Sequence, residues 1–107
     1  MRLITPLVFV SLMTSYAQAQ SGLDPAAQRG LTIARTHCAR CHSIDRKTAS
    51  PLAIAPPFRT LHKKYPVENL QESMAEGLST GHPTMPEFRF EIDQIHDFIA
   101  FLKSLER

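Results

Sequence analysis

The stretch Cys38-Ala39-Arg40-Cys41-His42 is the pattern around which the rest of the chain is organised. Two cysteines separated by two residues and followed by a histidine form the attachment signature of c-type haem. Each thiol can add across one vinyl group of the porphyrin, and His42 then lies under the iron as an axial ligand. The chain contains only these 2 cysteines. The motif therefore predicts one covalently attached haem c, bound through Cys38 and Cys41.

Other uses of a Cys-x-x-Cys pair agree less well with the surrounding sequence. A thioredoxin-like redox pair is expected within a βαβ pattern, and no strand-like alternation surrounds these cysteines. A structural zinc site needs about four protein ligands, usually from two such pairs. The chain has no second pair. A simple disulfide and two unmodified thiols remain as alternatives.

Length and charge indicate one small domain without a strongly charged partner. The chain has 107 residues, a formal net charge of +2 and no internal repeat. This charge is too small to indicate nucleic acid or an anionic membrane surface as a partner. A domain this short buries little apolar surface by itself. A large apolar cofactor at its centre would supply part of the missing core.

The N-terminus has the pattern of a secretory signal peptide. Arg2 precedes the largely apolar run Leu3–Met13, and Ala17-Gln18-Ala19 has the small-x-small pattern of a cleavage site. We expect residues 1–19 to be removed after export and residues 20–107 to form the domain. A retained membrane anchor is the alternative, but the apolar run is shorter than the roughly 20 residues that span a bilayer. No second apolar run of that length follows.

A helix is predicted from Asp24-Pro25 to about the first cysteine. Asp24 is a good N-cap, and proline is favoured at the first helical position. Small and apolar residues share one face, namely Ala27, Gly30, Leu31 and Ala34. A glycine inside a helix costs about 1 kcal/mol relative to alanine. Gly30 therefore marks either a close approach of another backbone or an ordinary tolerated glycine.

A second long helix is predicted from about Glu91 to Leu105. Its apolar line is Ile92, Ile95, Ile99 and Leu102, with Phe98, Phe101 and Leu105 beside it. Its polar side, which we expect to face water, contains Asp93, Gln94, His96, Asp97, Lys103 and Ser104.

The segment from Ser43 to Pro57 has no periodicity and contains three prolines, so it is predicted to be a loop. A ligand imidazole needs its second nitrogen hydrogen-bonded, and we expect the Pro56 carbonyl to accept that bond from His42. Phe58 and Leu61 then begin a short helical turn. Its basic residues are Arg59, Lys63 and Lys64. They form either a solvated face or a site for partner docking or haem propionates.

A further helix is predicted to begin at Pro66 and to end near Gly77. Its apolar stripe is Val67, Leu70, Met74 and Leu78. Met74 belongs to this stripe, which favours core packing over iron ligation. His37 and His62 lie elsewhere and are expected at the surface.

Met85 lies in a loop that Pro83 and Pro86 stiffen. A thioether is a weak ligand and binds iron well only when a stiff loop presents it. Packing of the methionine against aromatic residues is the alternative. His82 competes as sixth ligand, and a bis-histidine haem would have a lower potential than a His/Met haem.

Residues 20–107 resemble, nearly end to end, a small bacterial monohaem cytochrome c of class I. The resemblance is carried by Cys38–His42, by Ala55-Pro56-Pro57-Phe58, by Met85 in Gly81–Pro86, by Gly30 and Ala34, and by Phe98, Phe101 and Leu102. It implies an all-α, cytochrome c-like fold with three to four short helices around the haem. In the family the first and last helices cross at close range, which would explain Gly30.

The sequence departs from the family pattern at several points. Ala34 stands where an aromatic residue is common, and Ala55 stands where a glycine precedes the loop proline. The chain between His42 and Met85 is short, so the haem edge beneath it is expected to be more exposed.

The resemblance implies a soluble, monomeric periplasmic electron carrier rather than an enzyme. His42 and Met85 would be the iron ligands, and transient redox proteins would be the partners. A haem enzyme or gas sensor, and a subunit docked to one periplasmic oxidoreductase, are the alternatives.

Overall fold

We describe Leu3 and residues 22–77 and 85–107 in a computed structural model of the chain. The elements are, in order, α1 (Pro25–His37), the 3-10 segments η1 (Phe58–Lys63) and η2 (Val67–Asn69), α2 (Leu70–Glu76) and α3 (Ile92–Ser104). These elements are all helical, which confirms the all-α prediction. Most of the expected signal peptide, and the segment with His82 and Pro83, lie outside the described residues.

Helix α1 begins and ends where local sequence rules place it. The Asp24 carboxylate accepts a hydrogen bond from the Ala27 amide at 2.7 Å, and Pro25 occupies the first turn. Ala27, Gly30 and Ala34 are buried on one face. The helix closes as the Cys38 amide donates to the Ala34 carbonyl at 2.8 Å. The haem motif therefore starts directly at the C-terminal end of α1.

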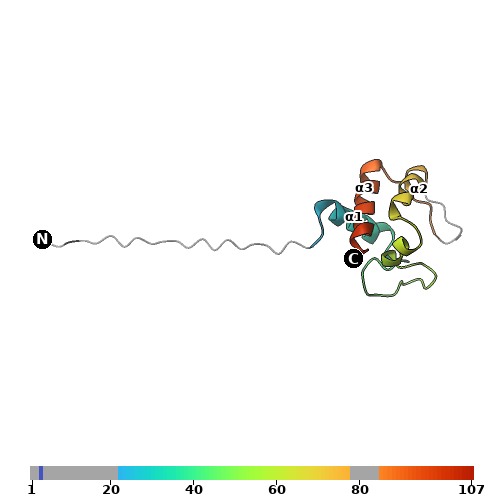
Figure 1. The fold of residues 1–107 in the computed structure, drawn as a ribbon, viewed down its shortest axis with the longest axis horizontal. Helices are drawn as coiled ribbons and strands as arrows, with labels where there is room; N and C mark the ends of the chain where they lie inside the picture. Colours follow the sequence, from blue (N-terminus) through green and yellow to red (C-terminus); the bar gives the residue numbers. More distant parts are fainter. Residues whose placement is uncertain (1–2, 4–21, 78–84) are drawn as a thin grey trace.

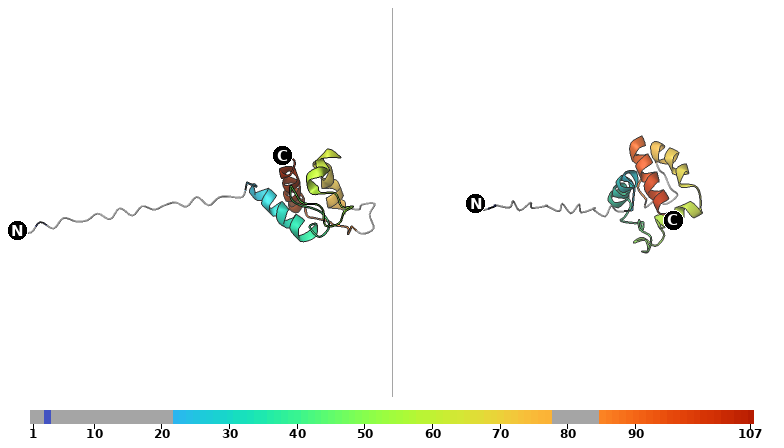
Figure 2. Two further views of the ribbon diagram at one scale, coloured as in Figure 1. Left: turned by 90° about the horizontal axis from the view of Figure 1, so that it is seen from below. Right: turned by 60° about the vertical axis from the view of Figure 1, so that its left-hand side comes forward.

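Helix α3 lies between α1 and α2 and crosses α1 at very short range (Figures 1 and 2). A Cβ atom placed on Gly30 would lie 2.0 Å from the Asp97 carbonyl oxygen and 2.7 Å from the Phe101 Cβ. Only glycine fits at this crossing. The close backbone approach is thus the reason for Gly30.

The ion pair beside this crossing corrects one expectation. The Arg29 guanidinium donates two hydrogen bonds to the Asp97 carboxylate, at 2.9 and 3.0 Å. The Asp97 side chain is only 15% exposed, whereas the sequence pattern placed it in water. The arginine covers it from the neighbouring helix, and the pairing raises the pKa of Arg29.

Helix α3 supplies most of the core. Glu91 and Gln94 form a capping box at its start, and its buried residues are Ile95, Phe98, Ile99, Phe101 and Leu102. Ile92 was predicted to share the apolar line, but 58% of it is exposed. It stands at the first position of α3, one turn before the buried stripe begins.

The short elements complete the core from the other side. Phe58 and Leu61 of η1, Val67 of η2 and Met74 of α2 are all buried. Met74 is 2% exposed, which confirms that it packs in the core. The helix predicted from Pro66 starts as a 3-10 turn and ends at Glu76, where Gly77, with a φ of 112°, forms the C-cap. This left-handed backbone favours glycine.

The loop between His42 and η1 is held in place by its own polar groups. The Asp45 carboxylate accepts hydrogen bonds from the Lys47 and Thr48 amides, both at 2.7 Å. A third bond, from the Thr48 hydroxyl, contributes most to lowering the pKa of Asp45 to about 2. The Phe58 amide donates to the Ser43 carbonyl at 3.0 Å and closes the loop.

Arg59 and His62 differ from their expected surface roles. The Arg59 guanidinium donates to the Thr48 carbonyl at 2.7 Å and to the Ser43 hydroxyl at 3.2 Å. It therefore braces the loop instead of forming a solvated face. His62 is half-buried, and its Nδ1 atom is buried without a hydrogen-bond partner in the described part of the chain.

Replacing Gly30 with alanine is expected to destabilise the folded protein. Alanine gains about 1 kcal/mol in helix propensity. The added methyl group must displace the Asp97 carbonyl, which lies 2.0 Å from its position. We expect a net loss of about 1–3 kcal/mol, as for other overpacked sites. Denaturant unfolding of the holoprotein measures this loss.

Gly22→Ala is the matched control, because nothing lies within 4 Å of a Cβ at Gly22. That variant should unfold at the wild-type midpoint. A Gly30→Ala protein as stable as the control would contradict the tight crossing.

Candidate haem site

Two adjoining apolar cavities lie between the end of α1 and the segment that begins at Met85. The outer one, about 520 Å³ including its open mouth, is lined in part by Cys41, Leu52 and Ile54. The inner one, about 630 Å³ including its opening to solvent, reaches the core residues Leu61, Met74 and Phe98, among others. Cys38, His42, Met85 and Phe88 line both cavities. Together they form one continuous apolar site.

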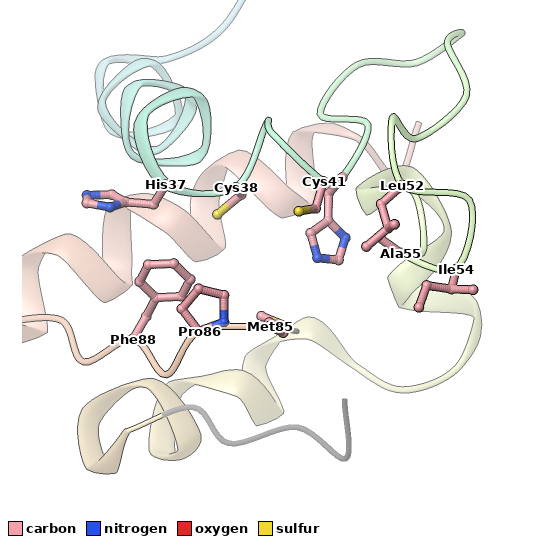
Figure 3. A pocket seen from close by; sticks show the side chains of 10 residues that line it. His37, Cys38, Cys41, Leu52, Ile54, Ala55, Met85, Pro86 and Phe88 are labelled. Carbon is pink, nitrogen blue, oxygen red and sulfur yellow. The ribbon is translucent and has the colours of Figure 1, made fainter. Parts of the chain in front are cut away.

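The two cysteines lie in a turn that folds back under the end of α1. The Cys41 and His42 amides both donate to the Cys38 carbonyl, at 3.1 and 3.0 Å. Both residues are free cysteines, and their sulfur atoms point toward the outer cavity (Figure 3). One local turn thus presents two thiols to the same apolar space.

The ionisation of Cys38 argues against a redox-active dithiol. Burial raises the pKa of Cys38 to about 11. Reactive redox cysteines instead have pKa values lowered to about 3.5–7.5. The apolar surroundings favour a neutral sulfur, as a thiol or a thioether.

The hydrogen bond of His42 fixes which nitrogen is free to bind a metal. Its Nδ1 atom lies 2.8 Å from the Pro56 carbonyl oxygen. A carbonyl only accepts, so Nδ1 carries the hydrogen and Nε2 keeps its lone pair. The Phe58 ring lies beside the imidazole, with centroids 4.8 Å apart. The hydrogen bond expected from the sequence is present in the structure.

Met85 lies across the cavity from the cysteines, in the wall formed by the segment Met85–Phe90 (Figure 3). Two hydrogen bonds hold this segment against α2. The Phe90 amide donates to the Met74 carbonyl at 3.1 Å, and the Arg89 guanidinium donates to the Glu76 carbonyl at 2.7 Å. His82 lies outside the described residues, so its position is not compared with that of Met85.

The residues around the cavities fit a haem better than a bare metal ion. A free imidazole nitrogen and a thioether line the same space as two thiols and many apolar side chains. In the described ranges, no group of three or more His, Cys, Asp and Glu residues is placed to hold a metal ion. The thiols, the imidazole and the apolar walls therefore fit a porphyrin.

Several residues that line the site were not assigned to it by the sequence. Among these residues are His37, Leu52, Ile54, Tyr65 and Phe90. Tyr65 and Phe90 come to the cavity through tertiary packing, which no local pattern encodes. Burial raises the pKa of Tyr65 above its ordinary value.

A helical fold with a Cys-x-x-Cys-His turn over an apolar cavity defines a c-type haem protein. The family model for cytochrome c matches residues 27–106, and the chain belongs to the cytochrome c family. It is similar to cytochrome c-552 of Bradyrhizobium diazoefficiens, with 28% identity over 89 residues, 83% of this chain and 84% of that protein. No solved structure matches the chain.

Membership in this family establishes the cofactor and the general activity. The cofactor is covalently attached haem c, and Cys38 and Cys41 fit its attachment motif. Cytochromes c are electron-transfer haem proteins and typically carriers rather than enzymes. Among the residues that the structure describes, no helix is long and apolar enough to cross a membrane.

Replacing both cysteines with alanine is expected to abolish covalent haem attachment. Without a thiol at position 38 or 41, no thioether can form in the turn after α1. Wild-type protein that is denatured and extracted with acid acetone should still stain for haem, whereas the double variant should not. Met85→Ala keeps both thiols and should stain like the wild type. Stain in the extracted double variant would refute this attachment site.

Proposed function

We propose that the chain is a soluble, monomeric electron carrier of the bacterial periplasm, with His42 and Met85 as the axial ligands of its haem. Residues 1–19 are its signal peptide, and Cys38 and Cys41 form the thioether links. Haem, when bound, supplies a ferric–ferrous couple that takes up and releases one electron at a time. The partners are redox proteins that dock only transiently.

The placement of His42 and Met85 in the same cavity is the observation that best supports this function. One comes from the turn after α1 and the other from the facing wall. A ligand on each side would leave the iron no open position for oxygen or another substrate, as suits a carrier. Pro56 orients the imidazole through its carbonyl, and this bond also raises the basicity of the ligand nitrogen.

The mouth of the outer cavity supports electron exchange at an exposed haem edge. Leu52 and Ile54 line this cavity and are 38% and 62% exposed. A small apolar rim is suited to brief contacts of limited area, which are typical of redox encounters.

Replacing Met85 with alanine tests the ligand assignment and the carrier function together. The wild-type ferric protein should be low-spin, with the charge-transfer band of a methionine sulfur ligand. The variant should keep its haem and lose this band. Its potential should fall by on the order of 0.1 V or more, within the roughly 0.8 V range that axial ligands span. Spectra and a redox titration measure both.

Met74→Leu is the control, since it keeps the volume of a buried methionine and should retain the band. An unchanged potential in the Met85 variant would assign the ligand to His82 or Met74. A high-spin wild-type protein that binds carbon monoxide at once would favour a haem enzyme or gas sensor. Stable copurification with one oxidoreductase would favour a dedicated subunit.

Replacing Ile54 with glutamate tests the docking edge without requiring a known partner. Electron self-exchange between ferric and ferrous copies brings two haem edges together, and NMR line broadening measures its rate. A charge at this rim disfavours the apolar contact. We expect self-exchange to slow by roughly tenfold, or about 1.4 kcal/mol, with an unchanged potential.

Ile92→Glu introduces the same charge at an isoleucine that is 58% exposed at the start of α3, in neither of the cavities described. It should change the rate by less than about twofold, well under 1 kcal/mol. Equal slowing in both variants would place the electron-transfer contact elsewhere.

A further inference from the structure

His37 makes contacts that are unusual for a histidine at an exposed position. It is the last residue of α1, and its ring meets two aromatic rings of the segment after Met85. The ring centroids lie 5.7 Å from Phe88 and 5.5 Å from Phe90, at interplanar angles of 65° and 69°. Both are edge-to-face contacts, which are favourable for aromatic pairs. Figure 3 shows the imidazole lying over the Phe88 ring beside Cys38.

These two phenylalanines connect His37 to the core. Phe88 and Phe90 are stacked at 6.0 Å, and Phe90 is stacked in turn on Phe98 of α3 at 6.5 Å. Phe98 is 5% exposed and belongs to the main core. The His37 ring therefore packs on the outside of an aromatic stack that has a fixed position.

The segment Met85–Phe90 is thereby held from two directions. On one side, Phe90 and Arg89 donate hydrogen bonds to carbonyl groups of α2. On the other side, the His37 ring packs against Phe88 and Phe90. Helix α2 and helix α1 thus both fix the backbone that presents Met85.

His37 also has a special position relative to the haem motif. It directly precedes Cys38, and Phe88 follows Met85 by three residues. His37 and Phe88 line the outer cavity together with Cys38 and Met85. A single ring contact therefore joins the side of the site that attaches the porphyrin to the side that carries the thioether.

We propose that His37 is a positioning residue that holds the Met85 segment against the haem and so sets how firmly the thioether stays on the iron. This inference rests on the proposed function, because it requires Met85 to be the ligand. A thioether is a weak ligand, so its occupancy of the iron depends on how well the protein holds it in place. The contact requires a flat ring at position 37, whether imidazole or phenyl.

Competition by free imidazole tests this role in the ferric holoprotein. Added imidazole must displace Met85 before it can bind the iron, and loss of the methionine charge-transfer band reports the displacement. His37→Ala should bind imidazole on the order of tenfold more tightly, as expected from the loss of two aromatic contacts. His37→Phe restores a ring and should bind imidazole like the wild type.

His96→Ala is the matched control, since His96 is an exposed histidine of α3 and lines neither cavity. It should leave imidazole affinity unchanged. If His37→Ala lowers the denaturant midpoint but not the resistance to imidazole, the residue is merely structural and the inference is wrong. Equal affinities in His37→Ala and His96→Ala overturn it as well.

The same spectra separate this inference from the proposed function. A wild-type protein without the methionine band removes the ligand assignment and the inference together. A wild-type protein with the band, and a His37→Ala variant that resists imidazole equally well, removes only the role of His37.

Discussion

The contact between the backbones of α1 and α3 at Gly30 is the constraint on which the rest of the structure depends. The Asp97 carbonyl lies so close that a methyl group has no room, and the pair Arg29–Asp97 braces the helices beside it. The haem motif begins directly after α1, so the angle and depth of this crossing determine where both sulfur atoms lie. The cavity opens from that end of α1, and the remaining elements close around it.

The two walls of the cavity are fixed by separate means. On the His42 side, hydrogen bonds of Asp45 and Arg59 hold the loop after the haem motif in place. This loop positions the Pro56 carbonyl beside the His42 imidazole. On the Met85 side, an extended segment is tied to α2 by hydrogen bonds and to α1 by aromatic contacts. In the ligation proposed above, Met85 binds the iron through a thioether, which is a weaker ligand than an imidazole, so the second wall would depend more on this support.

Local sequence patterns predicted the parts of the fold that depend on interactions between residues adjacent in the sequence. The Asp24-Pro25 start, the stop at Gly77 and the turn after α1 each follow from a few adjacent residues. The predicted exposure was wrong for Ile92, which is exposed, and for Asp97, which is mostly covered. The exposure of a helical residue depends on which neighbouring elements pack over it, and hydrophobic periodicity does not specify those neighbours. Arg59 looked like a solvated cation for the same reason, since its acceptors lie eleven and sixteen residues away.

The sequence predicted the site residues that the haem-attachment motif requires. It did not predict the residues that reach the site only through tertiary packing. Cys38, His42 and the Pro56 carbonyl follow from the chemistry of attachment and ligation, whereas His37 and Phe90 became part of the site only through ring contacts.

The aromatic rings form one connected path through the core, with centroid separations of 4.8 to 6.5 Å. The path runs along His37, Phe88, Phe90, Phe98, Phe58 and His42. The path joins the wall that carries Met85 to the imidazole on the opposite wall. Close-packed interiors transmit small displacements, so repacking these rings would also shift the walls that carry His42 and Met85. A domain this small uses the same aromatic side chains to stabilise its fold and to connect the walls that carry His42 and Met85.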